Sequence, residues 1–125
     1  MNQSGISVKR IAHYYKISSE DIWVLHDDVD LLFKKIKIVK NRGSAGHKGV
    51  MSVIRQLGTI DFVRFRLGIG HQRAEQRQKG DVEDYVLAPF EAHEQDKARK
   101  MIKKATAAIE FALDKGIKKA MNKFN

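Results

Sequence analysis

The sequence predicts an α/β protein in which helices and strands form layers within one domain. Apolar residues recur at helical spacing in some segments and alternate at strand spacing in others, in the order helix, strand, strand, helix, strand, helix. The chain has 125 residues, of which 42% are hydrophobic. This length and composition are typical of one folded domain with one core.

The first half of the chain predicts one helix and two strands. Apolar side chains at roughly helical spacing predict a helix over residues 4–16, with Ser4 as a candidate N-cap. Residues 18–21 form a turn or a short helical start. Residues 22–25 are a short apolar run typical of a buried strand. Residues 35–40 mostly alternate lysine with apolar residues, which predicts a strand with one exposed basic face.

The middle of the chain predicts a loop, a helix and a strand. Residues 41–49 are rich in glycine and predict a loop. A helix follows, starting at His47 or Lys48 and running to Leu57, because Gly58 is a typical C-terminal signal. The alternation in residues 61–69 predicts a third strand, after which residues 71–80 predict a polar loop and residues 81–87 a short helix.

The last part of the domain, residues 91–124, predicts a basic amphipathic helical segment. Its long helix starts near Glu91, Gly116 interrupts it, and a second basic helical segment follows. The outer surface of the long helix is rich in lysine and arginine. Its predicted apolar face consists of Ala98, Met101, Ile102, Ala105, Ala108, Ile109, Ala112 and Leu113.

The composition limits the class of protein and its partners. The net charge of +9 favours a polyanion such as nucleic acid, because each neutralised phosphate releases counterions; a basic protein with no such partner is the alternative. The sequence contains no apolar run of the roughly 20 residues that span a membrane and no apolar segment typical of a secretory signal. It contains no cysteine, which agrees with a reducing cytoplasm. We therefore expect a cytoplasmic protein with no membrane partner.

Three aspartates, Asp27, Asp28 and Asp30, lie just past the predicted end of the strand at 22–25. In open α/β sheets, ligands bind beyond the carboxyl ends of strands. Side chains alternate on an extended backbone, so His26 and Asp28 share one side and Asp27 faces the other. Asp27 therefore needs a histidine from another segment to form a catalytic pair. A polar turn is the alternative, and a metal site is disfavoured because no EF-hand spacing follows.

The loop Asn-Arg-Gly-Ser-Ala-Gly-His-Lys-Gly at 41–49 is the second candidate site. Glycines let a backbone approach a ligand closely, and amides at a helix start attract anions. The spacing is not that of a P-loop. Lys48 is unfavourable at a helix N-terminus, which favours contact with a phosphate. A plain helix-entry loop is the alternative.

Five segments together resemble bacterial peptidyl-tRNA hydrolases, in the family's order and with its spacing over nearly the whole chain. They are MNQSG at 1–5, VLHDDVDL at 24–31, GSAGHKG at 43–49, LGT at 57–59 with FVRFRLGIG at 62–70, and YVL at 85–87 with Phe90. The resemblance implies a single α/β domain with a mixed twisted sheet flanked by helices. It implies hydrolysis of the ester between a peptide and the tRNA 3′ end. No metal or cofactor is expected, and a monomer is expected.

The resemblance also implies roles for individual residues. Asp27 would orient a base histidine, and Asn2, His47 and Lys48 would bind the substrate. The residues expected to contact the acceptor arm of tRNA are Lys37, Lys40, Arg42 and Lys103.

The chain departs from the family pattern in two ways. The family begins earlier, with a strand and a segment that carries the base histidine, so we expect this chain to be truncated and to lack that base. In the loop, Lys48 replaces the usual asparagine, and Ala45 replaces a glycine. Two alternatives remain open: an RNA-binding derivative without catalysis, and a chain in which His26 or His47 acts as the base. The alternation of the strand disfavours His26 for that role.

Overall fold

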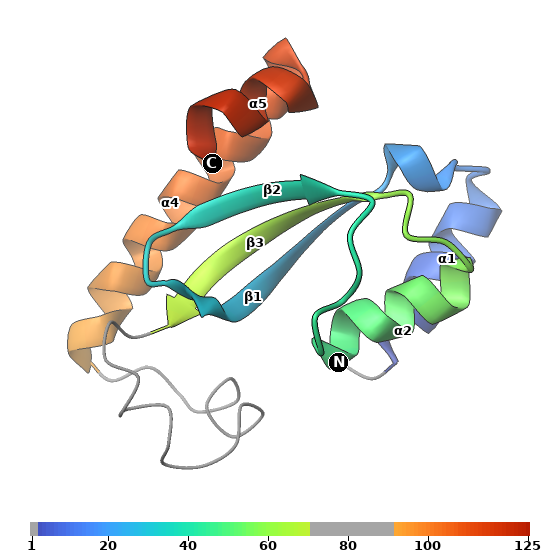
Figure 1. The fold of residues 1–125 in the computed structure, drawn as a ribbon, viewed down its shortest axis with the longest axis horizontal. Helices are drawn as coiled ribbons and strands as arrows, with labels where there is room; N and C mark the ends of the chain where they lie inside the picture. Colours follow the sequence, from blue (N-terminus) through green and yellow to red (C-terminus); the bar gives the residue numbers. More distant parts are fainter. Residues whose placement is uncertain (1–2, 71–91) are drawn as a thin grey trace. The chain divides into compact units, whose positions relative to one another are not determined.

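The structure is a computed structural model that describes residues 3–70 and 92–125 (Figure 1). In chain order its elements are α1 (Ser4–Tyr14), a 3₁₀ helix η1 (Ser19–Asp21), β1 (Trp23–Leu32), β2 (Ile36–Lys40), α2 (Lys48–Leu57), β3 (Val63–Gly70), α4 (Ala92–Lys115) and α5 (Ile117–Phe124). The predicted order of helices and strands is confirmed for these residues. The predictions for 71–80 and 81–87 lie outside the described residues.

The three strands form one sheet in the order β1-β3-β2. β1 and β3 are parallel: His26 pairs with Arg64 and Asp28 with Arg66, each pair separated by 38 residues in sequence. Figure 1 shows β2 running in the opposite direction. The sheet is therefore mixed, and the predicted α/β class is confirmed.

The described residues fall into two compact units. The first contains the residues up to His26 together with Val39–Arg64, and the second contains Asp27–Ile38 and the residues from Phe65 onward. Each strand of the sheet contributes residues to both units.

In the first unit, α1 packs against α2. Gly5 makes this possible, because a Cβ at that position would overlap the backbone of Ser52, whose side-chain hydroxyl accepts a hydrogen bond from the Gly5 amide at 3.0 Å. Val50, Val53 and Phe62 form the centre of the core. The partly buried residues around it are Val8, Ile22, Val24, Ile54 and Leu57.

The predicted ends of α2 are confirmed, while the predicted cap of α1 is wrong. His47 is the N-cap of α2, and Gly58 ends the helix in the left-handed conformation with φ 72°. Ser4 is already the first helical residue of α1, and the N-cap is Gln3, which makes no side-chain capping bond. The predicted helix start is off by one residue, at a helix end where no side-chain capping bond fixes the first turn.

In the second unit, α4 buries a narrow line of small residues and one methionine. Met101, Ala105, Ala108 and Ala112 are buried. Ile102 and Leu113, predicted on the same face, are 64% and 71% exposed. They lie about three helical turns apart on one line beside the buried residues, so the apolar stripe is wider than the face that packs.

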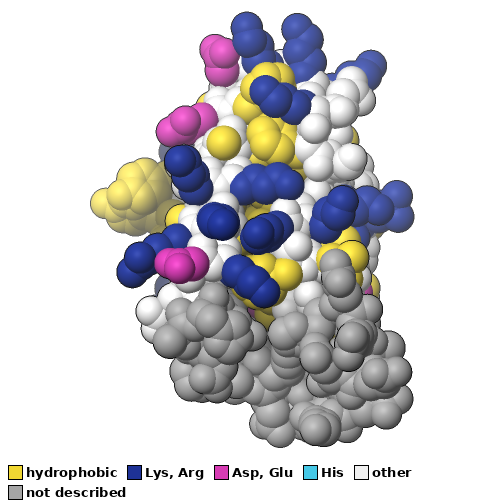
Figure 2. All heavy atoms as spheres, turned by 90° about the vertical axis from the view of Figure 1, so that its left-hand side faces the viewer, with side chains coloured by type: hydrophobic (Ala, Val, Ile, Leu, Met, Phe, Trp, Pro, Cys, Tyr) yellow, Lys and Arg dark blue, Asp and Glu magenta, His cyan; other side chains and the backbone are white. Residues whose placement is uncertain are grey.

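The basic character of α4 is confirmed on its outer surface. Figure 2 shows Lys and Arg side chains on both sides of an apolar band on the face turned toward the viewer. The exposed cations of this helix include Lys97, Arg99, Lys100, Lys103 and Lys104. None of the helices in the described part of the chain is both long and apolar enough to cross a membrane.

Asn125, which follows α5, is hydrogen-bonded to the edge strand β2. The Asn125 side-chain oxygen accepts a hydrogen bond from the Ile38 amide at 2.7 Å, and its nitrogen donates to the Ile38 carbonyl at 2.9 Å. The side-chain amide of Asn125 thereby bonds both the N–H and the C=O of Ile38, as the backbone of a neighbouring strand would. Phe111 of α4 and Phe124 of α5 meet edge to face, with ring centroids 5.9 Å apart.

Candidate functional site

The aspartates of β1 lie within a strand and not beyond its end. β1 continues to Leu32, so the predictions of a strand end before His26 and of a polar turn are both wrong. The predicted alternation is confirmed by pairing: His26 and Asp28, two residues apart, pair with Arg64 and Arg66, which are also two apart. These arginines of β3 thus bind two of the polar side chains, His26 and Asp28, that made the segment look like a turn.

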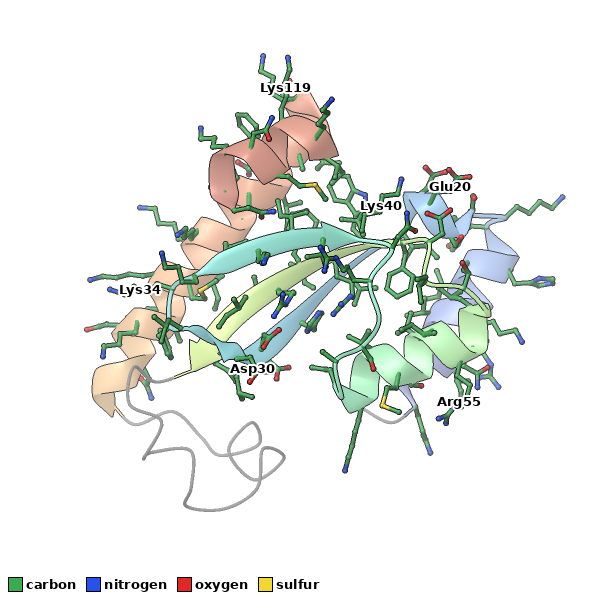
Figure 3. All side chains as sticks on the ribbon, viewed as in Figure 1. Glu20, Asp30, Lys34, Lys40, Arg55 and Lys119 are labelled. Carbon is green, nitrogen blue, oxygen red and sulfur yellow. The ribbon has the colours of Figure 1, made fainter. Side chains whose placement is uncertain are left out.

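Asp28 and Arg66 form an ion pair inside the second unit. The Arg66 Nε donates to the Asp28 carboxylate at 2.7 Å, and the side chains are 21% and 13% exposed. The other carboxylate oxygen of Asp28 accepts from the Asp30 amide at 2.8 Å. Both oxygens of Asp28 are therefore engaged within the fold. Asp30 is exposed on the same strand, where Figure 3 labels it.

Asp27 is partly buried and stands between His26 and Asp28 on β1. Its position in an extended strand directs it to the opposite face from those two residues. It belongs to the second unit, whereas His47 and Lys48 belong to the first. Asn2 lies outside the described residues.

A buried arginine organises the first unit around the glycine-rich loop. Arg64 is 4% exposed. One of its terminal nitrogens is 2.8 Å from the His26 Nε2, and the other donates to the Gly43 carbonyl at 2.6 Å. A single guanidinium thus connects β1 to the start of the loop. Sequence reasoning missed this role, although the apolar neighbours of Arg64, which are Phe62, Val63 and Phe65, were a usable signal.

His47 joins the same group of residues. Its ring meets the His26 ring edge to face, with centroids 4.6 Å apart. Its Nδ1 accepts a hydrogen bond from the Val50 amide at 3.2 Å, which caps α2. Because Nδ1 of His47 and Nε2 of His26 act as acceptors, neither nitrogen carries a proton in this arrangement. The structure therefore brings His47 and His26 together at the start of α2.

The loop itself contains two consecutive left-handed residues. Ala45 has φ 51° and Gly46 has φ 87°. Alanine adopts this region less readily than the glycine expected from the family pattern. A weak contact of 3.4 Å joins the Gly46 amide to the Ser44 hydroxyl.

The cations expected to bind tRNA are exposed. In the first unit these are Lys40 at the end of β2, labelled in Figure 3, and Arg42 in the loop; Lys48, expected to bind the substrate, is also exposed, at the start of α2. In the second unit, Lys37 lies on the edge strand β2 and Lys103 on α4. Among residues 3–70 and 92–125 there is no group of three or more potential metal-ligating side chains.

Comparison with known proteins points to one family. The family model for peptidyl-tRNA hydrolase matches residues 1–125. The chain is 42% identical over 127 residues to the peptidyl-tRNA hydrolase of Thermodesulfovibrio yellowstonii and 40% identical over 125 residues to that of Bdellovibrio bacteriovorus. Both alignments cover 100% of this chain and 65% of the relative.

Solved structures agree with the sequence comparison. The crystal structure of peptidyl-tRNA hydrolase from Acinetobacter baumannii superposes with a TM-score of 0.81 at 30% identity, covering 100% of this chain and 61% of the other. The chain therefore spans less than two thirds of the length of these relatives.

Proposed function

The chain belongs to the peptidyl-tRNA hydrolase family, and we propose that it hydrolyses the ester bond between a peptide, or an N-blocked aminoacyl group, and the 3′ end of tRNA. The products are the free acyl group and a tRNA that returns to translation. Similarity over all 125 residues carries the proposal. The net charge of +9 supports a polyanionic substrate. We place the reaction in the cytoplasm and assign it to a monomer without a cofactor.

In the proposed reaction, a general base takes a proton from water as the water oxygen attacks the ester carbonyl. The bond to the tRNA 3′ oxygen breaks, and that oxygen takes up a proton. Asp27 is proposed to orient the base histidine. Its carboxylate is partly buried on β1, where a strand holds it more firmly than a loop would.

The base is not assigned to any of the five histidines in the sequence. His26 is disfavoured because its Nε2 lies 2.8 Å from a guanidinium nitrogen of Arg64, which would have to release it before it could accept a proton. His47 is proposed to line the cleft together with Lys48, and Asn2 to position the substrate. The capping bond of His47 supports this placement, because it fixes the ring at the start of α2.

Binding of the tRNA acceptor arm is assigned to Lys37, Lys40, Arg42 and Lys103. All four side chains are exposed, so they can reach phosphates without the cost of burying a charge. Such contacts position an RNA without reading its sequence, which suits an enzyme that acts on many tRNAs.

Cleavage of N-acetyl-aminoacyl-tRNA by the purified chain tests the proposal, with release of the acyl group as the readout. Any turnover that depends on a histidine base should fall by about 10²-fold or more in Asp27→Asn, because the amide cannot stabilise the protonated ring. Asp30→Asn is the control at an exposed position three residues further along β1 and should leave the rate within about twofold.

Two outcomes would overturn the proposal. Turnover that survives Asp27→Asn would remove the assignment of Asp27. Absence of turnover, with salt-sensitive binding of tRNA retained, would contradict hydrolysis by these 125 residues and favour an RNA-binding derivative without catalysis.

A further inference from the structure

A groove of about 380 Å³ opens in the first unit, at the end of α1 and beside the end of α2. Its apolar lining consists of Ala12, Ile17 and Leu57. Its polar lining consists of Lys9, His13, Lys16 and Gln56. The groove is largely open to solvent, and its volume lies within the range of about 300–1,000 Å³ that is usual for small-molecule pockets.

The polar side chains come from one side of α1 and from the residue that follows its C-cap. Lys9 and His13 are spaced at i and i+4, which places them on one face of α1, and Lys16 follows the C-cap Tyr15. None of the described residues that line the groove is acidic. The groove therefore combines an apolar floor with nitrogen donors, and its lining offers no carboxylate that would repel an anion.

The backbone at the end of α1 explains why these lysines are available to a ligand. Ile17 donates to the Ala12 carbonyl at 2.8 Å, and Lys16 donates to the His13 carbonyl at 3.2 Å. These bonds close the helix end in a Schellman arrangement, with Lys16 left-handed at φ 55°. Lysines near a helix C-terminus often bond its last carbonyls, but backbone amides already do so here. Glycine is the usual residue at such a position, and here a lysine adopts it, at φ 55°.

We propose that this groove binds a phosphate-bearing ligand of nucleotide size. Lys9, His13 and Lys16 hold the phosphate, and the sugar or base lies on Ile17 and Leu57. The Gln56 side chain offers both a donor and an acceptor to a base edge. The ligand is either a free nucleotide or one nucleotide of an RNA strand. The site does not depend on ester hydrolysis, so it stands or falls separately from the proposed enzyme activity.

The test is a titration of the full chain with adenosine monophosphate, followed by amide chemical shifts. Saturable shifts are expected at Ile17 and Gln56, and adenosine, which lacks the phosphate, should produce far smaller ones. Lys16→Gly removes the cation and suits the left-handed backbone, so the fold should be preserved. We expect it to weaken binding about threefold to fivefold, the effect of one exposed charge pair.

Lys34→Gly is the matched control. Lys34 is also left-handed, with φ 73°, and lies in the turn before β2, outside the groove. The Lys34→Gly variant loses the same charge and has the same change at a left-handed residue. Because Lys34 lies outside the groove, this variant should bind adenosine monophosphate as the unchanged protein does. Equal weakening by the two variants, equal shifts with adenosine, or shifts that map away from the groove would each overturn the proposal.

The two sources of the phosphate separate in a second titration with single-stranded oligoadenylate. Binding that is tighter than that of the monophosphate, and weakened by Lys16→Gly but not by Lys34→Gly, assigns the groove to an RNA strand. Binding no tighter than that of the monophosphate assigns it to the free nucleotide.

Discussion

Arg64 and Arg66 are two residues apart on β3, and their environments differ. Arg64 is 4% exposed and holds a histidine ring nitrogen and the Gly43 carbonyl. Arg66 has a 21% exposed side chain and holds the carboxylate of Asp28. The Arg64 guanidinium is removed from water and hydrogen-bonded to neutral acceptors. The Arg66 guanidinium stays partly hydrated and is paired with a carboxylate of opposite charge.

The difference shows that the same residue type serves two purposes on one strand. A buried guanidinium is costly to desolvate, so its hydrogen bonds must be retained for the fold to be stable. A partly exposed ion pair contributes less, and salt screens it. We infer that Arg64 is mainly a tether for the glycine-rich loop and that Arg66 is the more replaceable of the two.

Replacing each arginine with methionine tests this comparison most severely. Arg64→Met should lower the free energy of unfolding by about 3 kcal/mol, because His26 and Gly43 lose a charged donor inside the protein. Arg66→Met should cost about 1 kcal/mol. Urea denaturation of both variants measures the difference. Equal losses would show that burial does not separate the two arginines.

His26 supplies the next test, since it is the ring acceptor of Arg64. His26→Leu should cost about 2 kcal/mol, because it leaves an Arg64 N–H without this acceptor in a buried site. His26→Gln keeps an acceptor and should cost about half as much. Thermal unfolding of the two variants gives the ranking, and a glutamine variant as unstable as the leucine variant would argue against the hydrogen bond.

A smaller effect is expected at the ion pair. Asp28→Asn should destabilise the protein by about 1 kcal/mol, and the loss should shrink as salt is added. The loss from Arg64→Met should change little with salt, because buried groups are screened less. Denaturation at low and high salt compares the two. A salt-independent loss at Asp28 would contradict its assignment as a screened pair.

The smallest effect is expected at Gly43. Its carbonyl accepts from Arg64, and a Cβ at this position would meet open space. Gly43→Ala should therefore change stability by less than about 0.5 kcal/mol. Gly5→Ala is the contrasting variant, since its Cβ would overlap Ser52, and it should be clearly destabilising. A large loss of stability in Gly43→Ala would mean that stability depends on the backbone conformation of the loop and not only on the Gly43 carbonyl.

The sequence was most informative where local chemistry decides the structure. The limits of α2 follow from its N-terminal loop and from Gly58, both of which act within a few residues. The end of β1 could not be predicted in the same way. Two of its polar residues, His26 and Asp28, are bound by arginines 38 positions away, and a local pattern of acids does not reveal a distant partner.

The candidate site shows the same limit. Alternation correctly grouped His26 with Asp28, but it could not name the arginines that bind them. The exposure of Ile102 and Leu113 was also missed, because periodicity identifies an apolar stripe and not the width of the surface that covers it. The roles of Asp27, Asn2, His47 and the tRNA-binding cations stay predictions.

The pairing of Asn125 with Ile38 has a consequence for the kinetics of amide hydrogen exchange. The Ile38 amide lies on an edge strand, where amides commonly exchange rapidly unless a partner covers them. Its protection therefore depends on an asparagine 87 positions away in sequence. The exchange rate of this single amide reports how often the end of α5 detaches, and Asn125→Ala should abolish its slow exchange while leaving interior amides of β3 protected.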